Sequence, residues 1–186
     1  VLTSAPQSPP VRENVNVGAV IRVTADLLSV TLPPAVKLDA VCGSDAEHLL
    51  VRVDRTGLTQ LITNLVTNAA EALGASSTAG GRIEISAGAF HISAEAGRPL
   101  GLQAGSYCRL CVADEGPGIA REHLDKVFEP FFTTKPQGKG TGLGLSVVQG
   151  LAKSWGGAVT VSSAPGELTR FIVHLPIAER QLQAAQ

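Results

Sequence analysis

Residues 138–144 read Gly-Lys-Gly-Thr-Gly-Leu-Gly, and an apolar pattern of helical period follows at once. Glycine lets backbone N–H groups approach an anion without a Cβ in the way, and the next helix presents unpaired N–H groups at its positive end. Lys139 and Thr141 add a charge and a hydroxyl. The segment predicts a phosphate-binding loop, although the glycines alone fit a flexible connector equally well. Its spacing matches neither the P-loop nor G-x-G-x-x-G, which disfavours both of those nucleotide folds.

The composition limits the classes of protein that remain. The chain has 186 residues, 44% of them hydrophobic, which suits one domain with a single core. A net charge of −1 without a basic run argues against nucleic-acid binding. No apolar stretch approaches the ~20 residues that cross a bilayer, so we expect no direct membrane contact. Three cysteines suit a reducing, cytoplasmic setting, and the absence of methionine suggests a piece of a longer protein.

Periodicity and turn residues predict an α/β domain over residues 14–178, between a Pro-rich linker (1–13) and a polar tail (179–186). Helical periods occupy 17–30, 56–73 and 143–155, with a shorter helix over 121–128. The expected strands are 36–41, 49–53, 82–92, 107–113, 159–163 and 171–175, and the segment 129–142 is a loop long enough to be functional.

The helix expected over 56–73 carries an unusual polar column. Asn64, Asn68 and Glu71 follow one another at steps of four and three, so they share one face opposite the apolar stripe. Asparagine is a poor helix former because its amide competes with the backbone for hydrogen bonds. Two asparagines in one column therefore indicate a function, although a solvated polar face is the simpler reading of either one alone.

Four segments, taken in order, resemble the catalytic ATP-binding domain of bacterial sensor histidine kinases, in the superfamily of Hsp90, gyrase B and MutL. They are the helix with Asn64 and Asn68, the turn Asp114-x-Gly116-x-Gly118, the segment 128–132 (Phe-Glu-Pro-Phe-Phe) and the glycine loop. The resemblance covers roughly residues 14 to 177 and is nearest to the nitrogen-regulation and hybrid kinases. It implies a Bergerat-type two-layer α/β sandwich, with helices on one face of a mixed β-sheet and a mobile lid over ATP.

The same resemblance assigns roles to individual residues. Asn68 would ligate Mg²⁺, Asp114 would accept a hydrogen bond from the adenine amino group, and Asn64, Lys135 and Thr141 would serve phosphoryl transfer. The full set expected to contact ATP comprises Asn68, Glu71, Asp114, Gly116, Gly118, Ile119, Phe128, Thr134, Lys135, Lys139, Gly140, Thr141, Gly142, Leu143 and Gly144.

The position of Asn64 favours a kinase over an ATPase. In Hsp90, gyrase and MutL a glutamate activates water one turn before the metal-binding Asn, and Asn64 holds that position here. The resemblance therefore implies transfer of the γ-phosphoryl of ATP to a histidine on a separate dimerisation domain, with a response regulator downstream and a homodimeric parent. Two alternatives stay open: a serine-directed kinase of the anti-sigma type, and a degenerate nucleotide-binding scaffold.

Overall fold

A computed structural model describes residues 11–43, 46–76, 80–135 and 140–178. Five strands form a mixed sheet in the order β2-β4-β5-β7-β6. They are β2 (Val36–Cys42), β4 (Gly81–Ile92), β5 (Gly105–Asp114), β6 (Ala158–Ser162) and β7 (Thr169–Pro176). Only β2 and β4 pair in parallel, and the other pairs in this sheet are antiparallel. The mixed sheet expected from the resemblance is therefore confirmed.

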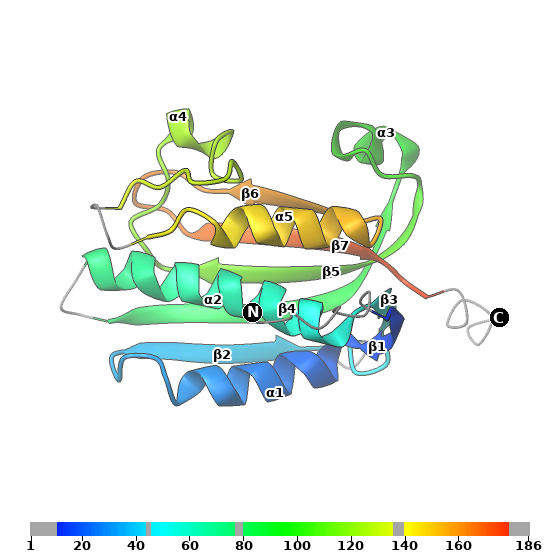
Figure 1. Cartoon of the computed structure of the whole chain (residues 1–186), viewed down its shortest axis with the longest axis horizontal. Helices are drawn as coiled ribbons and strands as arrows, with labels where there is room; N and C mark the ends of the chain where they lie inside the picture. Colours follow the sequence, from blue (N-terminus) through cyan, green and yellow to red (C-terminus); the bar gives the residue numbers. More distant parts are fainter. Residues whose placement is uncertain (1–10, 44–45, 77–79, 136–139, 179–186) are drawn as a thin grey trace, which may run out of the picture.

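Three helices lie side by side over one face of this sheet (Figure 1): α1 (Val17–Ser29), α2 (Arg55–Ser76) and α5 (Gly144–Ser154). Each helix turns its apolar stripe toward the strands. Leu61, Leu65 and Ile85 are fully buried between α2 and β4, and Val148 and Phe171 are buried between α5 and β7. This single layer of helices confirms the two-layer sandwich and fixes the rotation of α2, so that its polar side points away from the core.

Side-chain caps fix where two helices begin. Asp54 caps α2, because its Oδ2 accepts a hydrogen bond of 2.7 Å from the backbone N–H of Gly57. Asn16 caps α1 in the same way, with 2.7 Å between its Oδ1 and the N of Ala19. The helix expected over 121–128 is shorter, since α4 spans only Arg121–Leu124 and turns follow it.

Three short elements were not predicted. The strand β1 (Glu13–Asn16) pairs antiparallel with β3 (Leu50–Val53) in a separate two-stranded sheet, and α3 (Ala94–Gly97) with a 3₁₀ turn (Arg98–Leu100) lies between β4 and β5. β1 is polar and only four residues long, so its strand form comes from pairing with a distant segment and leaves no local signal. The tail expected over 179–186 lies outside the described residues.

Candidate functional site

A cavity of about 720 Å³ lies between α2, the end of β5 and the loop that precedes α5. Its size falls within the usual range for small-molecule sites. Most of its wall comes from three parts of the chain that the sequence had indicated: the polar column of α2, the turn after β5, and the described residues on either side of the gap at 136–139. The lining residues are Asn64, Thr67, Asn68, Glu71, Ala72, Asp114, Pro117, Gly118, Ile119, His123, Val127, Phe132, Thr133, Thr134, Lys135, Gly140, Thr141, Gly142, Gly144, Leu145 and Thr169.

The polar column of α2 faces this cavity. Asn64, Asn68 and Glu71 all line it, as their common face on the helix predicts. Asn64 also holds the neighbouring helix in place, because its Nδ2 donates a hydrogen bond of 3.3 Å to the carbonyl oxygen of Gly144, the first residue of α5. The start of α5 is thereby fixed beside the asparagines.

Asp114 is the buried acid of the site. It is the last residue of β5 and only 2% exposed, and its Oδ1 accepts a hydrogen bond of 2.9 Å from the backbone N–H of Gly116. Burial raises the pKa of Asp114 from 3.8 to about 6, against the smaller lowering effect of the Gly116 hydrogen bond. A buried carboxylate with a free oxygen is a strong acceptor for an N–H donor from a ligand.

The turn after Asp114 is packed directly against the loop between β6 and β7. Gly118 has a φ of +77°, and a Cβ placed there would lie 1.9 Å from the carbonyl oxygen of Ala164. The N–H of Ile119 donates to Ser163 Oγ at 2.9 Å, and Ser163 Oγ lies 2.8 Å from Thr169 Oγ1. This chain of contacts holds Thr169, which is 4% exposed and lines the cavity, opposite Asp114 in the β5–β7 register.

A backbone clasp joins Phe131 and Gly142 beside the cavity. The N–H of Phe131 donates a hydrogen bond of 2.9 Å to the carbonyl oxygen of Gly142. Gly142 has a φ of +65°, and a Cβ there would lie 2.4 Å from the carbonyl carbon of Phe131. Both the conformation and the close approach require glycine at this position. The clasp sets where the glycine loop meets the cavity.

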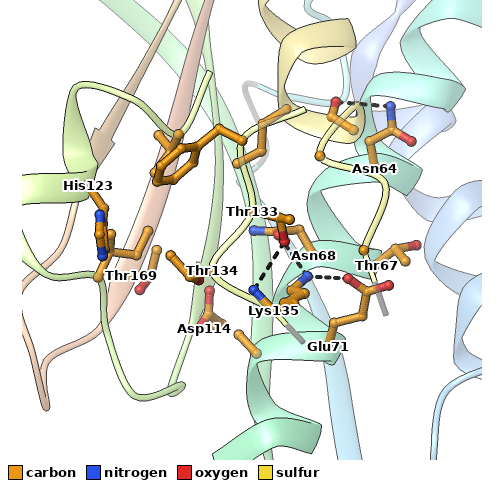
Figure 2. Close-up of a pocket in the computed structure, with 18 of the residues that line it drawn as sticks. Asn64, Thr67, Asn68, Glu71, Asp114, His123, Thr133, Thr134, Lys135 and Thr169 are labelled. Carbon is orange, nitrogen blue, oxygen red and sulfur yellow. Dashed lines mark hydrogen bonds and ion pairs between the residues drawn. The ribbon is translucent and has the colours of Figure 1, made fainter. Parts of the chain in front are cut away.

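Lys135 brings positive charge to the polar column (Figure 2). Its Nζ forms an ion pair with Glu71 Oε2 and lies 3.5 Å from Asn68 Oδ1. The backbone N–H of the same lysine donates to Thr133 Oγ1 at 3.1 Å. The side chain of Lys135 is 25% exposed, so the pair is partly shielded from water. The cavity wall therefore carries a group of polar side chains around a cation, in addition to the buried Asp114.

Four of the residues expected to contact a nucleotide do not line the cavity or cannot be placed. Phe128 packs edge-on against Phe171, with ring centroids 6.1 Å apart, and belongs to the core. Leu143 is 39% exposed, and Gly116 lies beside the site, where its N–H donates a hydrogen bond to Asp114. Lys139 lies outside the described residues. The other expected residues all line the cavity.

The structure also brings residues to the cavity that sequence reasoning had not selected as ligand contacts. Thr169 and His123 are the most polar of these, and the His123 ring lies 5.5 Å from that of Phe132. Neither leaves a local signal, since each reaches the site through the tertiary fold. The further unselected residues are Thr67, Ala72, Pro117, Val127, Phe132, Thr133 and Leu145.

Comparison with known families identifies the fold and the class of site. The family described as "Histidine kinase-, DNA gyrase B-, and HSP90-like ATPase" matches residues 53–179. The chain belongs to this family. The match spans all four segments on which the resemblance was based, and the family prediction is therefore confirmed.

The relatives are sensor kinases. The two-component sensor PprA of Pseudomonas aeruginosa is 38% identical over 142 residues, which make up 76% of this chain and 14% of PprA. The sensor kinase CckA of Brucella abortus is 40% identical over 129 residues, or 68% of this chain and 13% of CckA. The chain thus spans only a small part of the relatives it matches.

Solved structures give the same result. The catalytic domain of the histidine kinase ThkA superposes with a TM-score of 0.68 at 28% identity, covering 89% of this chain and 95% of that domain. Full-length ShkA, solved in complex with AMPPNP, gives a TM-score of 0.70 at 26% identity over 94% of this chain and 33% of ShkA. The Bergerat-type fold is confirmed.

Two kinds of feature are absent from the described ranges. None of the helices there is long and apolar enough to cross a bilayer. In those ranges no three or more His, Cys, Asp or Glu side chains gather as a metal site. Asn68 as the Mg²⁺ ligand stays a prediction.

Proposed function

We propose that this chain is the catalytic domain of a sensor histidine kinase, which binds Mg·ATP and transfers the γ-phosphoryl group to a histidine on a separate dimerisation domain. The observation that carries the proposal is the buried Asp114 in the cavity wall. A carboxylate there selects adenine over guanine. The amino group at C6 of adenine can donate a hydrogen bond to the carboxylate, whereas guanine carries a carbonyl oxygen at C6. The complex of ShkA with AMPPNP supports the same reading.

The polar part of the cavity wall around Lys135 suits the triphosphate. Lys135 would supply positive charge, Thr134 and Thr141 would donate hydroxyls, and the N–H groups of residues 140–144 would bind phosphate oxygens. Phosphoryl transfer needs mainly positioning and charge neutralisation from the protein, so these groups suffice together with a metal.

The donor set at Asn68 also suits Mg²⁺. The Asn68 amide oxygen already lies 3.5 Å from the Lys135 ammonium, which means that this oxygen points toward a position suited to a cation. Mg²⁺ bound there would neutralise charge on the phosphates during transfer. Asn64 beside it has no ionisable group and cannot remove a proton from water, which favours a protein acceptor over hydrolysis.

The acceptor and the partners follow from the same proposal. The histidine would belong to a dimerisation domain of the parent protein, which we expect to be a cytoplasmic or membrane-anchored homodimer that passes phosphate to a response regulator. Among the four histidines of this chain, His174 is buried and His123 lines the cavity beside the lid. Neither matches the exposed helical histidine that such a domain supplies.

The experiment is to incubate the parent protein with ATP labelled at the γ-phosphate. We expect a protein-bound phosphate that is lost in acid and stable in alkali, as phosphohistidine is, and Asp114→Asn should abolish it. Glu95→Gln, on the exposed α3 at the far end of the fold, is the matched control and should label normally. Acid-stable phosphate would instead favour the serine kinase, and ATP binding without labelling would favour the scaffold.

A further inference from the structure

Three side chains meet at one point of the cavity wall. Asn68 and Glu71 come from α2, and Lys135 reaches them from the segment that follows Phe132 (Figure 2). The Lys135 ammonium contacts an oxygen of each of the other two residues, forming an ion pair with Glu71 and lying 3.5 Å from the Asn68 amide oxygen. An amide oxygen and a carboxylate thus converge on a single positive charge.

The amide oxygen of Asn68 and the carboxylate of Glu71 belong to a rigid helix, whereas the Lys135 ammonium does not. Asn68 and Glu71 lie three residues apart on α2, where side chains are neighbours on one helical face. Leu65, Ala69 and Leu73 on the opposite face are buried, so the helix cannot rotate without exposing the core. Lys135 follows a stretch without regular secondary structure, and it can leave this position at much lower cost.

The chemistry of the two oxygens suits a divalent cation at least as well as an ammonium. Mg²⁺ is bound through one or two carboxylates together with phosphate oxygens and water, and Asn68 alone would bring no negative charge. An ammonium and a divalent cation repel each other at this distance, so they cannot share the position.

We propose that Glu71 is the second protein oxygen group of the cation site at Asn68, and that Lys135 occupies this site until the metal and the nucleotide arrive. The inference rests on the proposed function, because it needs a nucleotide that brings Mg²⁺ to Asn68. Glu71 then acts on the metal, directly or through its water, and not on the phosphates, whose negative charge it repels.

The test compares the affinity for AMPPNP with Mg²⁺ and in EDTA, measured by calorimetry on this chain. The quantity to compare is the factor by which Mg²⁺ raises the affinity for AMPPNP, here called the gain. By linkage, the nucleotide raises the affinity of the protein for Mg²⁺ by the same factor. Glu71→Gln should lower this gain roughly threefold to tenfold, as expected for a partly exposed charge, and leave the affinity in EDTA unchanged or slightly higher. The Glu71 side chain is 46% exposed, so the substitution should not disturb folding.

Lys135→Gln should change the gain in the opposite direction. Without the ammonium, Mg²⁺ displaces nothing, so the gain should rise even though the affinity in EDTA falls with the lost phosphate contact. Glu95→Gln removes the same charge from the exposed α3 and should leave the gain at the wild-type value.

Three results would overturn the inference. Glu71→Gln with a wild-type gain would remove Glu71 from the metal site; if the affinity also fell equally with and without Mg²⁺, that same result would assign Glu71 to the nucleotide. Lys135→Gln with an unchanged or smaller gain would show that the lysine does not occupy the cation position. Wild-type protein that binds no AMPPNP under either condition would overturn the proposed ATP site itself, and the inference with it.

Discussion

Replacing Asp114 with asparagine should stabilise the fold while it weakens nucleotide binding. The carboxyl group is 2% exposed, and burial raises its pKa from 3.8 to about 6. Below pH 3.8 the group is protonated in both the folded and the unfolded chain. As the pH rises, the unfolded chain loses the proton first, so the folded state is increasingly penalised until the pH exceeds about 6.

The size of the penalty follows from that difference in pKa. It amounts to about 3 kcal/mol at pH 8 and to roughly half of that at pH 5. Asparagine has nearly the same shape, keeps an oxygen for the Gly116 N–H and cannot ionise. Asp114→Asn should therefore raise the free energy of unfolding by about 3 kcal/mol at pH 8, and by clearly less at pH 5.

The assay is urea unfolding followed by circular dichroism at both pH values. Asp26→Asn, at an exposed aspartate of α1, is the matched control and should change the free energy by less than about 0.5 kcal/mol. A destabilised Asp114→Asn variant, or a difference that does not vary with pH, would refute the reasoning. Either result would mean that the carboxylate is well solvated or paired in the folded protein.

The other predictions concern glycine and core positions. Gly118→Ala should lower the melting temperature and reduce the free energy of unfolding by at least about 2 kcal/mol. Gly118 has a φ of +77°, and the new Cβ would lie 1.9 Å from the carbonyl oxygen of Ala164. Gly142→Ala should lower nucleotide affinity about tenfold with little loss of global stability, since it opens the clasp with Phe131 beside the cavity. Leu61→Ala should lower the free energy of unfolding, measured in urea, by about 2–5 kcal/mol, because Leu61 lies on the fully buried face of α2.

Two glycines without neighbours serve as controls. A Cβ at Gly101 would meet no atom within 4 Å, although its φ is +67°, so Gly101→Ala should cost only about 1 kcal/mol of conformational strain. Gly150 lies within α5 and is equally open, so Gly150→Ala should stabilise the protein by about 0.5–1 kcal/mol. If Gly118→Ala lowered the free energy of unfolding no more than Gly101→Ala does, the turn after Asp114 would not be closely packed against Ala164.

Local pattern was enough to predict most of the elements. The stripe of α2 and the strand patterns of β4 and β5 each depend on neighbours in sequence, and the structure has all of them. The four-residue strand β1 could not be found in this way, because only its pairing with β3 makes it a strand. The predicted extension of α4 to residue 128 was wrong, and Phe128 turns into the core instead.

The same distinction applies to the site. Asn64 and Asn68 were selected because a helix rarely carries two asparagines on one face, and both line the cavity. Thr169 was missed because it reaches Asp114 only through the pairing of β5 with β7. The contact of Lys135 with Glu71 likewise joins residues 64 positions apart, and no spacing rule connects a helix to a distant loop.

The most direct test of the central claim is calorimetric titration of this chain with AMPPNP and with the matching guanine analogue, both with Mg²⁺. The account predicts saturable binding of the adenine analogue, at least tenfold tighter than the guanine analogue, and strongly weakened by Asp114→Asn. Equal binding of the two analogues, or binding that survives Asp114→Asn unchanged, would contradict adenine recognition by Asp114.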